Sequence, residues 1–397
     1  MTAGKVLIIV ENLPAPFDRR VWMEAGTLKR AGYEVSIICP TGKGCESLEE
    51  EIDGIFIYRH RLPPEVSSAA GYLREYSAAL WGEWTLARRV RRLRGFDVIH
   101  ACNPPDLIFL VGAWFKLFHG TKFLFDHHDL NPELYESKFH RRDMFYRLLF
   151  WAERLTFRLA DTVISTNESY REVAIARGGK HPDDVFVVRS GPRVEAFQAV
   201  PPDPAFRRGR GYLVGYLGVM GEQDGVDHLL KAARVLVLDR GRTDIQFCLI
   251  GAGPAFEELQ ALARELGIAE FVEFTGRIPD EDVIRRLSSC DVCVDPDPSN
   301  PLNDKSTMNK ILEYMALERP IVQYDLLEGR RSAAEASLYA EPNNPRDLAA
   351  KIEQLLADPE ARARMGRLGR QRMVDTLEWK HQSVRLLDAY RKTLTGP

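Results

Sequence analysis

Short runs of β-branched and aromatic residues alternate with longer amphipathic stretches along almost the whole chain. Two of those stretches, Arg19 to Ala31 and Leu107 to Phe118, have apolar residues at helical spacing. The runs of the first half are Lys5 to Val10, Glu34 to Cys39, Asp97 to His100, Lys122 to Phe125 and Thr162 to Ser165. A repeated strand, helix, strand order produces parallel sheets covered by helices. The pattern therefore predicts an α/β protein.

The alternation is interrupted once, and a chain of 397 residues is long enough for two domains. Residues 197–211 contain three prolines and show no periodicity. Strands are expected again at Tyr212 to Leu217, Ile245 to Ile250, Val272 to Phe274, Val292 to Val294 and Ile321 to Tyr324. We predict an N-terminal Rossmann-like domain over 1–196, a linker over 197–211, a second Rossmann-like domain over 212–376, and a terminal helix over 377–397 that packs back on the first domain. Each domain should hold a doubly wound parallel sheet, with the ligand site in an interdomain cleft at the carboxyl ends of the strands.

Composition narrows the classes of partner. Lys plus Arg number 54 and Asp plus Glu number 57, so the net charge of −3 provides no overall positive field for nucleic acid. Six scattered cysteines favour a reducing compartment, and the pair Cys290 and Cys293 lacks the second pair that a zinc site needs, so we expect no metal. The longest apolar run, Leu107 to Phe115, is too short to span a bilayer. We expect a cytoplasmic protein that at most lies on the inner face of the cell membrane.

The loop after the fourth predicted strand of the second domain, with the helix behind it, is the most informative segment. Ser306 or Thr307 is expected to cap that helix, and Lys310 and Glu313 then share one helix face. Free amides at a helix start, with Lys305 beside them, favour a phosphate group, and a carboxylate one turn further on can hold a ribose diol. The segment is thus a candidate nucleotide site, although a capped helix with an exposed Lys and Glu pair explains the same residues.

The segment Lys-Ile-Leu-Glu-Tyr-Met-Ala-x-x-x-Pro-Ile-Val, residues 310–322, resembles the signature of family 4 of the retaining, nucleotide-sugar-dependent glycosyltransferases, which have the GT-B fold. Further segments occur in the family's order, namely residues 17–25, 28–35, 97–100, 125–129, 187–192, 215–218, 250–254 and 274–276. The resemblance covers essentially the whole chain. It implies transfer of a sugar, with retention and without a metal or other cofactor, from a UDP- or GDP-linked donor to a saccharide or lipid-linked acceptor. The expected setting is bacterial cell-surface polysaccharide or glycolipid synthesis.

The resemblance also implies roles for residues of the second domain. Glu313 matches the second acid of the family's Glu-x7-Glu motif and would hold the donor ribose, whereas Lys305 stands in place of the first acid. Val219 and Asp224 occupy positions where the family often carries an Arg and a Lys on the diphosphate. Because the leaving diphosphate needs donors aimed at its charge, other cations should replace them. The expected donor-binding set is Glu313, Lys310, Lys305, Ser306, Thr307, Gly218, Gly251, Gly253 and Arg193.

In the first domain, His128 follows the predicted strand Lys122 to Phe125, and the family carries a His there against the donor sugar. Asp126 and Asp129 complete the expected catalytic group, and the resemblance implies that the β-phosphate of the leaving nucleotide takes the acceptor proton. A His at a strand end is otherwise often a structural, hydrogen-bonded residue. Three residues at the first strand-helix junction are expected on the acceptor side, namely Arg19, Arg20 and Glu24.

Two rival functions and one possible partner surface follow from the same residues. A sugar-nucleotide epimerase on this fold would need no acceptor, and a catalytically silent glycosyltransferase-like subunit would bind no nucleotide. The stretch Tyr72 to Arg94, with Arg88, Arg89, Arg91, Arg92 and Arg94 at its end, and the stretch Arg141 to Leu159 both combine arginines with aromatic residues. Such helices suit an anionic membrane surface, and ordinary packed helices are the alternative.

Overall fold

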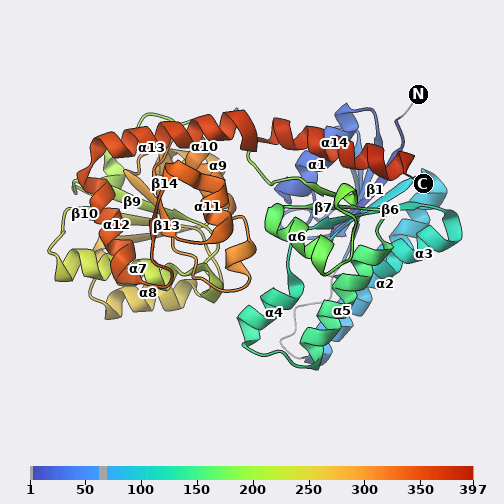
Figure 1. Cartoon of the computed structure of the whole chain (residues 1–397), viewed down its shortest axis with the longest axis horizontal. Coiled ribbons are helices and arrows are strands. Elements are labelled where there is room, and N and C mark those ends of the chain that lie inside the picture. Colours follow the sequence, from blue (N-terminus) through green and yellow to red (C-terminus); the bar gives the residue numbers. More distant parts are fainter. Residues whose placement is uncertain (1–2, 62–68, 105, 397) are drawn as a thin grey trace. The chain divides into compact units, whose positions relative to one another are not determined.

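The computed structural model of the chain describes residues 3–61, 69–104 and 106–396. It contains two compact units (Figure 1): unit 1 comprises Met1–Ser190 and His381–Pro397, and unit 2 comprises Gly191–Lys380. The division therefore falls six residues before the predicted one. The segment 197–211, expected as a linker, belongs to unit 2, because the Val200 and Asp203 amides donate to the hydroxyls of Ser288 and Ser289.

Unit 1 is built on an eight-stranded sheet with the order β3-β4-β2-β1-β5-β6-β7-β8. Every neighbouring pair is parallel except β3 with β4. The strand order reverses between β1 and β5, which makes this the switch point of the sheet. The strands are β1 (Lys5–Ile9), β2 (Glu34–Pro40), β3 (Glu49–Ile52), β4 (Ile55–His60), β5 (Val98–Cys102), β6 (Lys122–His127), β7 (Thr162–Ser165) and β8 (Val185–Val187).

The helices of unit 1 connect these strands and cover the sheet. The first begins at Arg19 because the carboxylate of Asp18 accepts the Val21 amide at 3.1 Å and caps the helix start. The helices are α1 (Arg19–Arg30), α2 (Ala69–Leu93), α3 (Phe109–His119), α4 (Asn131–Phe139), α5 (Met144–Leu159), α6 (Glu168–Ala176) and α14 (Trp379–Thr395), which begins in unit 2. From α14, Tyr390 is buried in unit 1 and bonds His100.

Unit 2 holds a six-stranded, fully parallel sheet with the order β11-β10-β9-β12-β13-β14 and its switch point between β9 and β12. Its strands are β9 (Tyr212–Leu217), β10 (Ile245–Ile250), β11 (Val272–Gly276), β12 (Val292–Asp295), β13 (Ile321–Tyr324) and β14 (Ser337–Ala340). Its helices are α7 (Val226–Arg234), α8 (Phe256–Glu265), α9 (Asp280–Ser288), α10 (Asn309–Ala316), α11 (Leu327–Ala333), α12 (Pro345–Ala357) and α13 (Pro359–Arg372).

Both faces of the unit 2 sheet are buried. Along β9, Leu213 belongs to one core cluster while Val214 and Tyr216 belong to another. Since successive side chains of a strand point to opposite faces, these clusters cover the two sides of the sheet. The prediction of two α/β domains with doubly wound parallel sheets is thus confirmed, with the strands β3, β4, β8 and β14 in addition to those predicted.

Candidate active site

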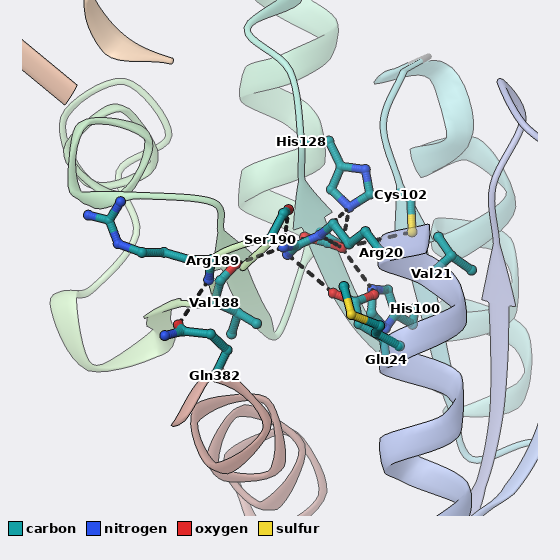
Figure 2. A network of polar contacts seen from close by, with 12 residues as sticks. Arg20, Val21, Glu24, His100, Cys102, His128, Val188, Arg189, Ser190 and Gln382 are labelled. Atoms are coloured by element: carbon teal, nitrogen blue, oxygen red, sulfur yellow. Dashed lines mark hydrogen bonds and ion pairs between the residues drawn. The ribbon is translucent and has the colours of Figure 1, made fainter. Parts of the chain in front are cut away.

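A polar network lies at the carboxyl ends of the central strands of unit 1, and Arg20 is its centre (Figure 2). From the first turn of α1, Arg20 donates through Nη2 to Asp126 Oδ1 at 2.8 Å and through Nε to Asp126 Oδ2 at 3.1 Å. Through Nη1 it donates to the Val188 carbonyl at 2.7 Å and to Ser190 Oγ at 3.0 Å. One buried guanidinium therefore joins α1, the end of β6 and the segment after β8.

His128 is attached to this network by one ring nitrogen. Its Nε2 is in hydrogen-bond contact with Asp126 Oδ2, and Arg20 Nε donates to the same nitrogen at 2.8 Å. The His128 amide donates to Asn103 Oδ1, which fixes the backbone after β6. His128 remains partly exposed while Asp126 is fully buried. The arrangement leaves Nδ1 outside the network, and so available to a ligand.

The charges of the network are settled by burial and by Arg20. Burial opposes ionisation of Asp126, but Arg20 and His128 outweigh it and hold the pKa of Asp126 well below its usual range. Burial and the neighbouring Asp126 raise the pKa of Glu24 well above its usual value, against the opposing effect of Arg20. Burial also lowers the pKa of His100, whose Nδ1 lies 2.8 Å from the Tyr390 hydroxyl. Arg20 is thus the positive charge that favours the ionised form of Asp126.

Four buried side chains around Arg20 offer metal-type donors. The ligand atoms of Glu24, His100, Cys102 and Asp126 all lie within 4.8 Å of one another. Burial raises the pKa of the Cys102 thiol well above its usual value. Arg20 already contacts Glu24 and Asp126, at 3.2 Å and 2.8 Å, and supplies the positive charge that an ion would bring. We therefore assign Arg20 as the resident cation of this cluster.

The three residues predicted on the acceptor side do not share one environment. Arg20 and Glu24 are buried in the network, whereas Arg19 is exposed. Their place on the acceptor side stays a prediction. The catalytic candidates are brought together, because His128 and Asp126 are bonded. Asp129 follows His128 and is half-buried, and burial raises the pKa of its carboxyl.

In unit 2, the predicted glycines lie where backbones meet beside the β9 and β12 switch point. Gly251 has φ +135°, and a Cβ there would come within 1.8 Å of the Gly218 carbonyl. A Cβ at Gly253 would come within 2.5 Å of the Met220 carbonyl. The loops after β9 and β10 therefore pack backbone to backbone, and only glycine permits that approach. These glycines shape the candidate donor site by allowing close packing.

Lys310 has partners that the sequence did not reveal. Its buried Nζ donates to Asp297 Oδ1 at 2.7 Å, to Asp297 Oδ2 at 2.9 Å and to Asp295 Oδ1 at 3.2 Å. Burial and Asp295 raise the pKa of Asp297 well above its usual value. The ammonium charge is therefore balanced inside the fold. The hypothesis that Lys310 replaces a missing diphosphate cation is not supported by this geometry.

The helix behind the loop begins later than predicted. α10 starts at Asn309 with Met308 at its cap position, and no side chain caps it. Ser306 Oγ instead donates to the Leu302 carbonyl at 2.8 Å, so the prediction that it caps the helix is wrong. The same loop is held by Asn303, whose amide donates to the carbonyls of Gln223 and Pro298. Ser306 and Thr307 thus lie in an extended lead-in to α10.

The remaining donor candidates lie at or near the surface of unit 2. Glu313, on α10, and Lys305 are half-buried, and Arg193 is exposed. Tyr314 is a residue that sequence reasoning missed: its hydroxyl accepts the Leu217 amide at 2.8 Å and donates to the Val294 carbonyl at 3.2 Å. It ties α10 to the ends of β9 and β12. The signal was its place beside Glu313 in the signature segment.

Two families of glycosyltransferase domains match the chain in succession. Residues 18–191 match the glycosyl transferase 4-like domain, and residues 211–358 match glycosyl transferases group 1. The chain is 27% identical over 308 residues to alpha-maltose-1-phosphate synthase of Mycolicibacterium smegmatis, and this match covers 71% of this chain and 76% of that protein. It is 31% identical over 173 residues to the GDP-mannose-dependent alpha-(1-6)-phosphatidylinositol monomannoside mannosyltransferase of the same organism, covering 41% of this chain and 44% of that protein.

The fold gives the same result. Sucrose-phosphate synthase from Thermosynechococcus elongatus has a TM-score of 0.82 to this chain at 19% identity, covering 99% of this chain and 100% of that one. Two parallel-sheet units with polar side chains at their carboxyl edges, together with these matches, define a glycosyltransferase of the GT-B fold. Within that class, the chain belongs to the family 4 type.

Proposed function

We propose that the protein transfers a sugar from a nucleoside-diphosphate sugar, with retention of configuration, to a saccharide or lipid-linked acceptor in cell-surface polysaccharide or glycolipid synthesis. The observation that carries the proposal is His128, held through Nε2 by Asp126 with Nδ1 outside the network. A relative of this chain carries GDP-mannose and a phosphatidylinositol acceptor in its name, which supports both the donor and the acceptor class. The donor base, UDP or GDP, is decided by the binding experiment below.

Each unit has a proposed part in the reaction. Unit 2 binds the donor: Glu313 holds the ribose, Lys305, Ser306, Thr307 and Arg193 serve the diphosphate and sugar, and the backbone at Gly218, Gly251 and Gly253 receives the nucleotide. Unit 1 supplies His128 against the donor sugar. Asp126 is a positioning residue, since it contacts His128 and Arg20. Asp129 belongs to the same loop, and Arg19 is the exposed residue of the acceptor-side group.

Retention is proposed on the resemblance to family 4, in which the leaving β-phosphate takes the acceptor proton. The Asp126 carboxylate is engaged by Arg20, so it is proposed to position His128 and not to act as the base. Transfer to an acceptor with product analysis by NMR tests this: an α-linked donor should give an α-linked product, and a β-linked product would contradict it.

Replacing Glu313 by Ala should weaken nucleotide binding and leave the fold intact. Charge-assisted hydrogen bonds to a ribose diol contribute about 1.5 to 3 kcal/mol, which corresponds to a rise in Kd of roughly 10-fold to 100-fold. Calorimetric titration with UDP and with GDP measures this and identifies the base. Glu258→Ala, an exposed acid on α8, is the control and should bind like the native chain. Native affinity in Glu313→Ala would remove Glu313 from the site.

We also propose that unit 1 contacts an anionic membrane surface through α5. One face of this helix exposes apolar and basic residues together: Trp151 is 60% and Met144 85% exposed, and Leu148, Arg147, Arg154 and Arg158 are also exposed. Apolar and basic residues on one helix face are typical of interfacial helices. Among the described parts of the chain, no helix is long and apolar enough to cross a bilayer.

The arginines at the end of α2 are a weaker candidate for a membrane-contacting surface than those of α5. Arg94 stacks on Phe56, Arg91 bonds the Phe96 carbonyl and Arg89 pairs with Glu49. The side chains of the predicted stretch before Ser77 lie outside the described part. These contacts engage much of that cluster within unit 1, so α5 carries the proposed surface.

Sedimentation with liposomes should therefore depend on α5. Arg147, Arg154 and Arg158 changed together to Gln should reduce binding to vesicles with acidic lipid, because each basic residue near such a surface adds about 1 kcal/mol. Binding of the native chain should fall at high salt, where charges are screened within a few ångströms. The matched control changes Arg88, Arg89 and Arg91 to Gln. Equal binding to neutral and acidic vesicles, or a larger loss in the control, would oppose the proposal.

A further inference from the structure

Arg20 makes directed contacts with several separate parts of unit 1. Its three guanidinium nitrogens donate to both oxygens of Asp126, to His128 Nε2, to the Val188 carbonyl and to Ser190 Oγ. Ser190 is the last residue of unit 1 before the chain enters unit 2. Arg20 and Asp126 are 106 positions apart in the sequence, and Arg20 and Ser190 are 170 apart. The side chain thus links α1 to Asp126, which contacts His128, and to Ser190, where the chain leaves unit 1.

We propose that Arg20 is a positioning residue of the transferase reaction, which orients His128 through Asp126 and fixes the backbone from Val188 to Ser190. The inference rests on the proposed function of His128 and adds a residue that does not itself touch the sugar. Arg20 acts by holding both Asp126 oxygens, so that Oδ2 is directed at His128 Nε2. His128 Nε2 is then held by Asp126 Oδ2 and Arg20 Nε together, and Nδ1 stays outside the network, on the side of the ligand.

An arginine is needed at this position because of its shape as well as its charge. The guanidinium offers five N–H donors in a planar fork, which matches a carboxylate on one edge and two further acceptors on the other. A lysine would place one ammonium among four acceptors that diverge around Arg20. Lysine therefore keeps the charge and loses the orientation, which makes Arg20→Lys the informative conservative variant.

The same contacts make the protonation of Asp126 depend on Arg20. The groups that face Asp126 are Arg20 and Glu24 from α1, His100 and Cys102 from β5, and His128 from its own loop; Tyr390 of α14 stands behind His100. Of these, Arg20 carries a permanent positive charge, and burial raises the pKa of Glu24 well above its usual value. Without that charge, burial raises the pKa of Asp126. A protonated Asp126 no longer orients His128 as an anion would. On acidification, a variant without Arg20 should therefore lose activity at a higher pH than the native enzyme does.

The experiment compares the pH profile of kcat/KM in the native enzyme with those of Arg20→Gln, Arg20→Lys, Ser190→Ala and Arg30→Gln. Arg20→Gln should move the acid limb to higher pH and lower kcat about 100-fold, as expected for a misplaced catalytic group. Arg20→Lys should lower kcat with a smaller movement of the limb. Ser190→Ala should leave the limb in place. Arg30→Gln removes an exposed arginine from the other end of α1 and should match the native enzyme.

Two further measurements keep the proposal open to refutation if Arg20→Gln does not fold. Nitrogen-15 NMR of labelled histidine reports the His128 tautomer directly, and Arg20→Lys should change it from the tautomer of the native enzyme, whereas Arg30→Gln should not. An unchanged tautomer and an unchanged acid limb in the Arg20 variants would overturn the proposal. The NMR result is independent of turnover, so a failure of the catalytic role of His128, shown by His128→Ala, is distinguishable. Stoichiometric zinc in the purified native protein would also overturn it, since Arg20 would then not be the cation of the cluster.

Discussion

His128→Ala should lower kcat by about 100-fold or more while the donor Kd stays close to the native value. A positioned acid-base or charge-stabilising side chain contributes roughly 10²-fold to 10⁴-fold to rate. Since His128 is proposed to contact the reacting sugar, its interaction is strongest in the transition state and its loss appears in kcat rather than in binding. Asp126 keeps its two bonds to Arg20 in this variant, so the fold should survive.

The measurement is release of nucleoside diphosphate from a panel of nucleotide sugars, with calorimetry for the donor. His181→Ala provides the control, because His181 is 70% exposed in the segment before β8. The control should have native turnover and a native melting temperature. Native turnover in His128→Ala, together with native binding, would return His128 to a structural role at the end of β6.

Lys310→Met should destabilise unit 2 by about 3 to 5 kcal/mol. Removing one member of a buried ion pair leaves its partners without compensation, which is among the most costly single changes in a protein. Here the loss strands Asp295 and Asp297, both of which bond Nζ in the native fold. The free energy of unfolding is measured by urea titration. The deficit should shrink at low pH, because protonated carboxyls need no cation.

Two variants make this result interpretable. Asp297→Asn should cost less than Lys310→Met, since Lys310 keeps Asp295 as a charged partner in that variant. Lys231→Met removes an exposed lysine that pairs with Asp227 on α7, and exposed pairs contribute at most about 1 kcal/mol. If Lys310→Met unfolds like the native chain but loses more affinity for nucleoside diphosphates than for nucleosides, the lysine is a ligand of the diphosphate after all.

Several strands that were predicted from a short run of β-branched and apolar residues have the expected bounds. Tyr212–Leu217, Ile245–Ile250 and Ile321–Tyr324 have the bounds expected from their β-branched runs. These strands are buried on both faces, so their apolar composition is continuous and ends at polar or glycine residues. The start of α10 was predicted too early, because Ser306 bonds the Leu302 carbonyl and does not cap the helix.

The candidate site divides in the same way. The fold class, the family and the places of His128 after a strand and of Glu313 on a helix could be predicted from local patterns, because strand periodicity and short motifs are properties of neighbouring residues. The burial of Arg20 against Asp126, and the pairing of Lys310 with Asp295 and Asp297, could be seen only in the folded chain. A charged side chain on a predicted helix has the same local pattern whether it meets solvent or a carboxylate. Which of these occurs depends on partners that lie 13 residues away in the sequence for Lys310 and 106 residues away for Arg20. Once such a charge is buried, it needs its partner, because an unpaired buried charge is costly.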